Sequence, residues 1–424
     1  MAANDIFEID DIQQNDRIPG SIGFVFILLA LAVSVASLPG FNYLVDVWGV
    51  LTMIVFIIAS FLGGIKFAPE FFVFIIFILW GMIASVSAQY MELVITALFT
   101  LAQISMLILL LVNYSQNTKS VIVLLIAVLI GCGIVGVSGV LSGEYQRAEF
   151  VGERAAGITL NANSFAITLL MASAICLFFF RIWKSIFIKA GLVVLILGCA
   201  KLILSSGSRK GFIGFLLLLG LWFIFSYRKQ IFKKPLQFVI GSIAVITIAG
   251  LFYTWSHGSI TMQRFEKQDF AKDTRMSLYR AGFVIIAKHP VFGVGLNHYR
   301  IVSGEELYSH SNYIELMSTT GIPGAIIYYS IYLILWLRLS RLGKLDLPDR
   351  DKELVNLGKI LLLLQAPLDL VGVFYLSKLT WIFFAIFIGW SNCKYKSLRT
   401  QEEIAQEQAL ADQSSQEQEI GYPL

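Results

Sequence analysis

Residues 256–312 form a long polar stretch between two apolar runs, and its side chains are of types that bind anions and move protons. All four histidines of the chain lie in it. Its seven cations are Arg264, Lys267, Lys272, Arg275, Arg280, Lys288 and Arg300, against the acids Glu266, Asp269, Asp273, Glu305 and Glu306. Guanidinium groups bind phosphate oxygens through two parallel hydrogen bonds, and histidine exchanges protons near neutral pH. The stretch therefore predicts a site resting on a membrane scaffold.

Two further cation clusters are expected on the same face. Arg147 and Arg154 lie in SGEYQRAEFVGERAAGITLNANS, and Arg209 and Lys210 lie in SSGSRKG. By the alternation of spans, all three clusters fall on the non-cytoplasmic side, where Lys and Arg act against the insertion bias. Three clusters on one face favour an anionic ligand. An alternative stays open for each single cation, namely that it only lies at the edge of a loop and binds no ligand.

Arg209 is especially well placed for an anion. It follows Ser205-Ser206-Gly207-Ser208 at the point where a helix is predicted to begin, so backbone N–H groups and the helix dipole add to its charge. The alternative is a helix-capping serine with a snorkelling arginine beside it, and the short pattern does not separate the two.

His310 opens the apolar run that begins HSNYIEL, and a helix end would hold it in place. A histidine fixed in this way can serve in proton transfer. His257, His289 and His298 are expected in turns or at the surface.

The composition predicts the scaffold. Of 424 residues, 57% are hydrophobic and 14% charged, and the mean hydropathy is +0.76. Such a chain is an all-α polytopic membrane protein and not a soluble domain. Runs long enough to span a bilayer predict about twelve helices, with the large polar loop between the ninth and tenth. They lie near 21–38, 41–64, 71–88, 91–112, 120–142, 163–180, 186–204, 211–226, 236–255, 313–337, 355–375 and 377–392.

Orientation follows from the cations in the other set of loops. That set holds Lys66, Lys119, Arg181, Lys184, Arg228, Lys229, Lys233, Lys234, the segment after Arg338, and Lys394, Lys396 and Arg399, and it is expected to be cytoplasmic. Both termini share that side. Residues 1–19 form an acidic tail without a cleavable signal peptide, and 393–424 form a Gln/Glu-rich tail predicted as weak helix or disorder. The net charge of +4 is thereby explained without a nucleic-acid partner.

The segment TRMSLYRAGFVIIAKHP predicts an amphipathic helix on the bilayer surface. Its apolar stripe would be Met276, Tyr279, Phe283 and Ile286, with cations off the stripe. FGVGLNHY then supplies glycines for a tight turn.

No metal or other cofactor is expected, because the loops lack a paired acidic motif or a His/Asp ligand cluster. The four cysteines are expected to be small core residues. Asp46, Glu92, Lys201 and Asp369 are charges within spans, which are costly unless paired or facing a cavity. Lys201 and Asp369 fall near the non-cytoplasmic ends, where either could reach the site or its rim.

Four motifs carry a family resemblance. They are RAAGITLNANSFA (154–166), SGSRKGF (206–212), DTRMSLYRAGFVIIAKHPVFGVGLNHY (273–299) and HSNYIELMSTTGIPG (310–324). In this order and with this sidedness, they resemble the O-antigen ligase and polymerase superfamily of bacterial envelope glycosyltransferases. The resemblance covers roughly 154–330, and the layout of spans extends it over the whole chain. It implies a transmembrane glycosyltransferase domain at 20–392 with a periplasmic loop at about 256–312.

The resemblance implies a location and a chemistry. The chain would lie in the bacterial inner membrane and transfer a glycan from an undecaprenyl-pyrophosphate carrier to a lipid A–core or glycan acceptor at the periplasmic face, with inversion and without metal. Arg209 and Arg275 would hold the pyrophosphate and His310 would act on the acceptor hydroxyl. Further substrate contacts would come from Arg154, Asn163, Lys210, Arg264, Arg280 and Tyr313.

Other functions stay open. A ligase is favoured over a polymerase on length and layout, and a protein glycosyltransferase ranks third because that branch usually carries a larger C-terminal periplasmic region. A transporter or flippase of lipid-linked sugar fits the spans equally well, although no inverted repeat is evident. A structural or regulatory membrane protein is less consistent with the loop of histidines and arginines.

Overall fold

The protein is described here by a computed structural model covering residues 18–35, 42–141, 145–148, 152–155, 159, 161–233, 250, 254, 259–267 and 274–420. The described residues are mainly α-helical, as the composition predicts. One short antiparallel hairpin pairs β1 (Tyr145–Ala148) with β2 (Gly152–Ala155) between two helices.

Most of the helices lie on the predicted apolar runs. They are α2 (Ile22–Ser34), α3 (Asn42–Gly63), α4 (Pro69–Ala84), α5 (Met91–Tyr114), α6 (Thr118–Leu141), α7 (Ala162–Ile182), α8 (Ile186–Ser205), α9 (Arg209–Lys233), α11 (Ile260–Lys267), α12 (Thr274–Lys288), α13 (Tyr299–Val302), α14 (Asn312–Leu342), α15 (Asp349–Leu370) and α16 (Lys378–Ile420). Eleven of the twelve predicted runs coincide with one of these helices. The other run, 236–255, lies almost wholly outside the described residues.

Within the described part of the chain, seven helices are long and apolar enough to cross a membrane: α3, α5, α6, α7, α8, α9 and α14. α2 and α4 are apolar but shorter. α15 carries Lys352, Glu353, Lys359 and Asp369, which lower its hydropathy. The protein is therefore a multi-pass membrane protein, and the number of twelve spans stays a prediction.

α7 lies at the centre of the half of the bundle that contains the candidate site. Of its most apolar window, 83% of the residues are buried, and it contacts α6, α8, α9 and α15. Small residues permit this close packing, because a Cβ at Gly211 of α9 would come within 2.5 Å of Ala166 Cβ on α7. Membrane helices associate largely through such close contacts between small residues.

α14 is interrupted near one end. Gly321 has φ +70° and ψ 175°, and Pro323 follows it. The turn after α12 packs against this interruption, where the N–H groups of Val294 and Gly295 donate to the carbonyls of Ser318 and Thr319, each at 2.9 Å. Irregular backbone at membrane depth requires partners of this kind. Two of the family-like motifs, FGVGLNHY and STTGIPG, thus contact each other directly.

A buried ion pair joins α4 to α14. Arg338 Nη1 lies 2.7 Å from Glu70 Oε1, and Arg338 Nη2 donates to Glu70 Oε2 at 3.1 Å. A second pair, Lys394 Nζ to Asp351 Oδ2 at 2.8 Å, joins α16 to α15. Both pairs lie far from the α14 interruption, and in each of them a buried carboxylate is paired with a cation.

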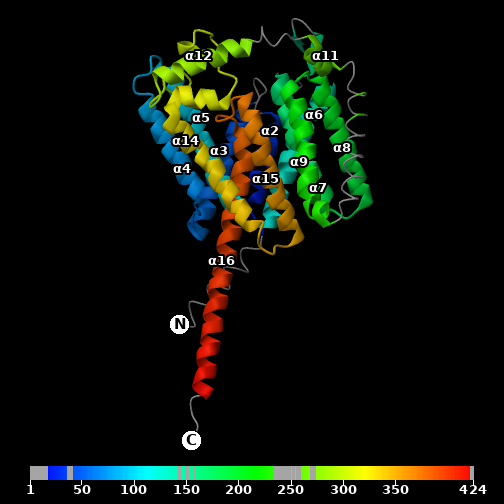
Figure 1. The fold of residues 1–424 in the computed structure, drawn as a ribbon, viewed down its shortest axis with the longest axis vertical. Helices are drawn as coiled ribbons and strands as arrows, with labels where there is room; N and C mark the ends of the chain where they lie inside the picture. The colour runs from blue at the N-terminus through cyan, green and yellow to red at the C-terminus, as the bar shows by residue number, and fades with distance from the viewer. Residues whose placement is uncertain are drawn as a thin grey trace.

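The polar helices gather at one end of the bundle. Figure 1 shows α11 and α12 capping that end, while the last part of α16 projects away from the opposite end. α16 continues through the Gln/Glu-rich segment to Ile420, so of the two alternatives for this tail the helix is the one present. The two helices α11 and α12 of the long polar stretch and the last part of α16 therefore lie at opposite ends of the bundle, as the topology prediction requires.

Candidate active site

A cavity of about 230 Å³ lies between α9, α12 and α15 at the end of the bundle that carries the polar helices. Three cations from two distant parts of the sequence line it, together with apolar residues from α9 and α15. The lining residues are Arg209, Lys210, Ile213, Gly214, Leu217, Arg275, Leu364, Pro367, Leu368 and Val371.

The N-terminus of α9 presents the first two cations. Gly207 adopts φ +64°, a left-handed conformation that favours glycine, and Ser208 Oγ accepts the N–H of Gly211 at 3.3 Å. Ser208 therefore caps α9, while Arg209 and Lys210 in its first turn line the cavity. The capping serine of the second interpretation is therefore confirmed, and anion binding by Arg209 stays a prediction.

Ser208 also connects α9 to α7. Its hydroxyl donates to Asn163 Oδ1 at 2.9 Å, and Asn161 caps α7 by accepting the N–H groups of Asn163 and Ser164. Asn163, a predicted substrate contact, is thereby placed next to the turn that carries Arg209. Its amide oxygen serves to hold that turn.

Lys210 points towards the loop that follows α15. Its Nζ lies 5.6 Å from the centroid of the Phe374 ring, and a Cβ added at Gly372 would meet the same Nζ at 3.2 Å. The charged end of this cavity-lining lysine thus lies next to the loop.

Arg275 is the second residue of α12, which is fixed on two sides. Tyr279 Oη donates to the carbonyl of Leu370 at 2.8 Å, at the end of α15. Leu278 and Ile285 are buried against Ile314 of α14. Arg275 is therefore held near the end of α15 and lines the same cavity as Arg209.

The packing face of α12 differs from the predicted stripe. Leu278 and Ile285 are buried, whereas Met276 and Phe283 of the predicted stripe are 47% and 60% exposed. Gly282 lies on the buried face, where a side chain would collide with Ile314. The predicted helix is confirmed, and it packs on the protein through another face, which contains a glycine. Whether the outer face meets the bilayer stays a prediction.

The end of α15 is organised around Asp369. Its carboxylate accepts Gln365 Nε2 at 2.7 Å, Tyr329 Oη at 3.1 Å and Asn312 Nδ2 at 3.4 Å. Asn312 Oδ1 in turn accepts the N–H groups of Phe374 and Tyr375 at 3.0 and 2.9 Å. This network, centred on a fully buried carboxylate, ties α14 to α15 and to the loop after it.

Sequence reasoning singled out Asp369 as a charge within a span, but it missed Asn312 and Gln365. Asp369 itself is buried, while its neighbour Leu368 lines the cavity. Lys201, the other charge expected near this end, is exposed on α8. Polar residues at the same depth as Asp369 in neighbouring spans were the signal that could have found its partners.

His310 lies in a tightly held turn just before α14. On one side, Glu315 Oε2 accepts the N–H of Ser309 at 2.8 Å. On the other, Ser311 caps α14 and its hydroxyl donates to the carbonyl of Asp369 at 3.3 Å. His310 adopts φ +56°, and its ring centroid lies 4.6 Å from that of Tyr308. A non-glycine residue in this region is uncommon and is typical of functional sites.

The described histidines differ sharply in setting. His289 is exposed at the end of α12. His298 lies in a turn but is buried: Nε2 accepts the N–H of Tyr90 at 2.9 Å, and Nδ1 is 2.9 Å from the carbonyl of Leu296. Both of its nitrogens therefore serve structure. His257 lies outside the described residues.

The remaining predicted contacts are not all brought to the cavity. Tyr313 donates to the carbonyl of Ala366 at 3.1 Å and stacks on Tyr329, and Arg280 is exposed on α12. Arg154 lies in β2, which contacts α7 and α8, but its side chain and that of Arg264 are outside the described atoms.

The cavity is polar at one end and apolar along its length. Arg209 and Lys210 lie at the start of α9, and Ile213, Gly214 and Leu217 continue along the same helix. From residue 209 to 217 an α-helix rises about 12 Å, at about 1.5 Å per residue. The arrangement suits a molecule with an anionic head and a hydrocarbon tail.

Residues 193–329 match a family model described as O-antigen ligase. The matched segment begins in α8, ends in α14, and includes Arg209, Arg275 and His310. The resemblance to the O-antigen ligase and polymerase superfamily that the motifs predict is thus confirmed over this segment. No curated protein matches the chain.

Proposed function

We propose that this protein transfers a glycan from an undecaprenyl-pyrophosphate carrier to an acceptor sugar hydroxyl at the periplasmic face of the inner membrane. The match to the O-antigen ligase model supports an activity of the ligase or polymerase type. The observation that carries the proposal is that Arg209, Lys210 and Arg275 line one cavity whose other lining residues are apolar.

The cations would bind the diphosphate of the donor. A pyrophosphate leaving group gains negative charge as its bond to the sugar breaks, and guanidinium groups placed in advance stabilise that charge. The apolar part of the cavity, between α9 and α15, would receive the first part of the polyprenyl chain.

His310 would accept the proton of the acceptor hydroxyl. The acceptor oxygen attacks the anomeric carbon as the bond from that carbon to the pyrophosphate oxygen breaks, and undecaprenyl pyrophosphate leaves. The proton passes to His310, and a single displacement of this kind inverts the anomeric centre. The bonds that fix Ser309 and Ser311 support this role, since a proton-transfer group must be held in place.

The proposal is tested with purified protein in proteoliposomes that contain a lipid-linked glycan. We expect release of undecaprenyl pyrophosphate together with an extended acceptor. Lipid A–core and a second lipid-linked glycan are supplied in separate reactions: transfer to lipid A–core identifies a ligase, our preferred acceptor assignment, and transfer to the glycan identifies a polymerase. Movement of donor across the bilayer with its pyrophosphate bond intact would instead identify a flippase and reject the proposal.

The proposed sidedness predicts a labelling pattern. α11 and the end of α16 lie at opposite ends of the bundle, so cysteines placed at Ser259 and Gln418 should face opposite compartments. In intact spheroplasts, an impermeant maleimide should label the cysteine at 259 and leave that at 418 unlabelled until the membrane is permeabilised. The reverse pattern would place the cavity at the cytoplasmic face and contradict the proposed donor.

A further inference from the structure

A second cavity, of about 1010 Å³, lies at the opposite ends of α9 and α15 from the candidate active site. Its walls are the end of α7, the segment before α8, the later part of α9, the loop after α14 and the start of α15. The proposed transfer reaction makes no use of it. Its lining is strongly charged, with the cations Arg181, Lys184, Lys344, Arg350 and Lys352 and the acids Asp346, Asp349 and Glu353.

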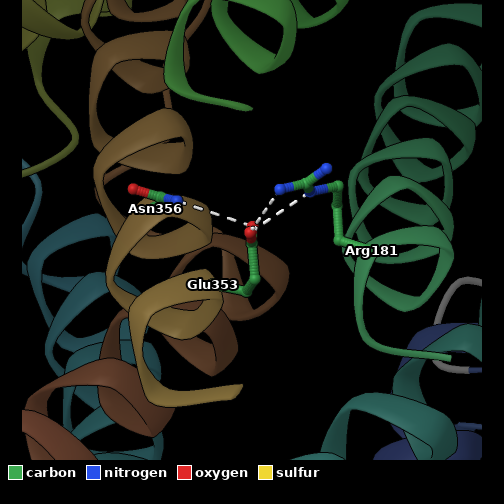
Figure 2. Close-up of polar contacts among 3 residues, drawn as sticks. All are labelled: Arg181, Glu353 and Asn356. Atoms are coloured by element: carbon green, nitrogen blue, oxygen red, sulfur yellow. Dashed lines mark hydrogen bonds and ion pairs between the residues drawn. The ribbon is translucent and has the colours of Figure 1, made fainter. Parts of the chain in front are cut away.

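Two of the acids are already neutralised by the protein. Figure 2 shows Glu353 between Arg181 and Asn356. Glu353 Oε1 accepts Arg181 Nη2 at 3.1 Å and Nε at 3.2 Å, and Asn356 Nδ2 donates to Oε2 at 3.5 Å. Asp346 pairs with Lys352 at 3.0 Å. Neither carboxylate is left to repel an anion.

The remaining charges favour an anion. Lys184, Lys344 and Arg350 are exposed, and within the described part of the chain none of them forms an ion pair. Against them stands one carboxylate, Asp349, in the first turn of α15, where the helix dipole stabilises it. Five cations and three acids leave an excess of two positive charges at this cavity.

The cavity also lies where hydrocarbon meets water. α7 ends at Ile182 and α8 begins at Ile186, so Lys184 falls between two spans. Next to it, Ile186 and Phe187 are 70% and 86% exposed. Trp183 stacks on Phe179 at 4.4 Å between ring centroids, and aromatic residues of this kind mark the headgroup level of a bilayer.

We propose that this cavity binds the phosphate headgroup of an anionic phospholipid. Lys184, Lys344 and Arg350 would contact the phosphate, and the acyl chains would run along the exposed apolar start of α8. Basic pockets between membrane helices bind anionic headgroups in this way. The proposal does not depend on the transfer reaction, because the cavity lies away from Arg209, Arg275 and His310.

The test uses purified full-length protein in a neutral detergent, titrated with dioleoyl phosphatidylglycerol and followed by native mass spectrometry. Dioleoyl phosphatidylcholine, with the same acyl chains, is the comparison. Each basic residue near an anionic surface contributes about fivefold in affinity. The variant with Lys184→Gln, Lys344→Gln and Arg350→Gln should therefore bind phosphatidylglycerol at least about tenfold more weakly and phosphatidylcholine unchanged.

A matched control removes the same charge from the same end of the bundle but outside the cavity: Lys66→Gln, Arg341→Gln and Lys396→Gln. It should bind phosphatidylglycerol like the unmodified protein. Equal weakening in the two triple variants would show a general charge effect and overturn the site, as would undiminished binding in the cavity variant. In a separate reaction, displacement of the lipid by an equal concentration of inorganic phosphate would show a soluble anion as the occupant and overturn the lipid assignment.

Discussion

Replacing His310 with alanine should lower the rate of glycan transfer by roughly a hundredfold to ten-thousandfold, the usual share of general-base catalysis. Binding of the lipid-linked donor should change little, because the cations that line the cavity remain. The measurements are donor binding and transfer in proteoliposomes, at equal levels of folded protein. The transfer rate should fall at saturating donor, since the missing group acts in the transition state.

The left-handed backbone of His310 calls for a second variant. Asparagine tolerates φ near +56° better than most residues, but it cannot accept a proton at neutral pH. His310→Asn should therefore be as impaired as His310→Ala if the ring acts as a base. Restored transfer in the asparagine variant would mean that the residue shapes the turn and takes no proton.

The other histidines provide graded controls. His289→Ala should transfer like the parent, because His289 is exposed at the end of α12. His298→Ala should instead reduce the amount of folded protein, since it removes a buried ring and leaves the N–H of Tyr90 and the carbonyl of Leu296 without their partner. Transfer by the His310 variants within about threefold of the parent would remove the base assignment.

The scaffold could be predicted because the bilayer imposes a length on each apolar run. The runs at 91–112, 120–142 and 186–204, for example, coincide with α5, α6 and α8. Cations on the side predicted to be non-cytoplasmic were equally informative, since Arg209 and Arg275 both line the cavity. Their predicted side of the membrane marked these two arginines as unusual, because Lys and Arg resist translocation. It could not show that they line one cavity.

What the sequence could not supply depends on contacts between distant segments. In the sequence, Asn312 is an ordinary polar residue at a helix start. In the structure its Oδ1 accepts the N–H groups of Phe374 and Tyr375, which lie in a distant loop. The buried face of α12 escaped prediction for a related reason. Gly282 contributes no hydrophobicity, yet Ile314 of α14 lies so close to it that there is no room for a side chain.

Replacing Arg209 or Arg275 with lysine should cost about tenfold or more in transfer. Lysine keeps the charge but loses the planar fork that binds two phosphate oxygens at once. Arg341→Lys is the matched control, because this arginine is exposed at the last turn of α14, at the other end of the bundle, and should leave transfer unchanged.

The double variant Arg209→Lys, Arg275→Lys tests whether the two arginines hold one diphosphate. Both line the same cavity from different helices, α9 and α12. Groups that bind the same ligand act as a unit, so the double variant should lose less than the product of the two single losses. Losses that multiply would mean that the arginines act on separate features of the substrate. Full transfer in both single variants would show that the two arginines only anchor the protein at the membrane surface. The cavity would then lose its assignment as the donor site.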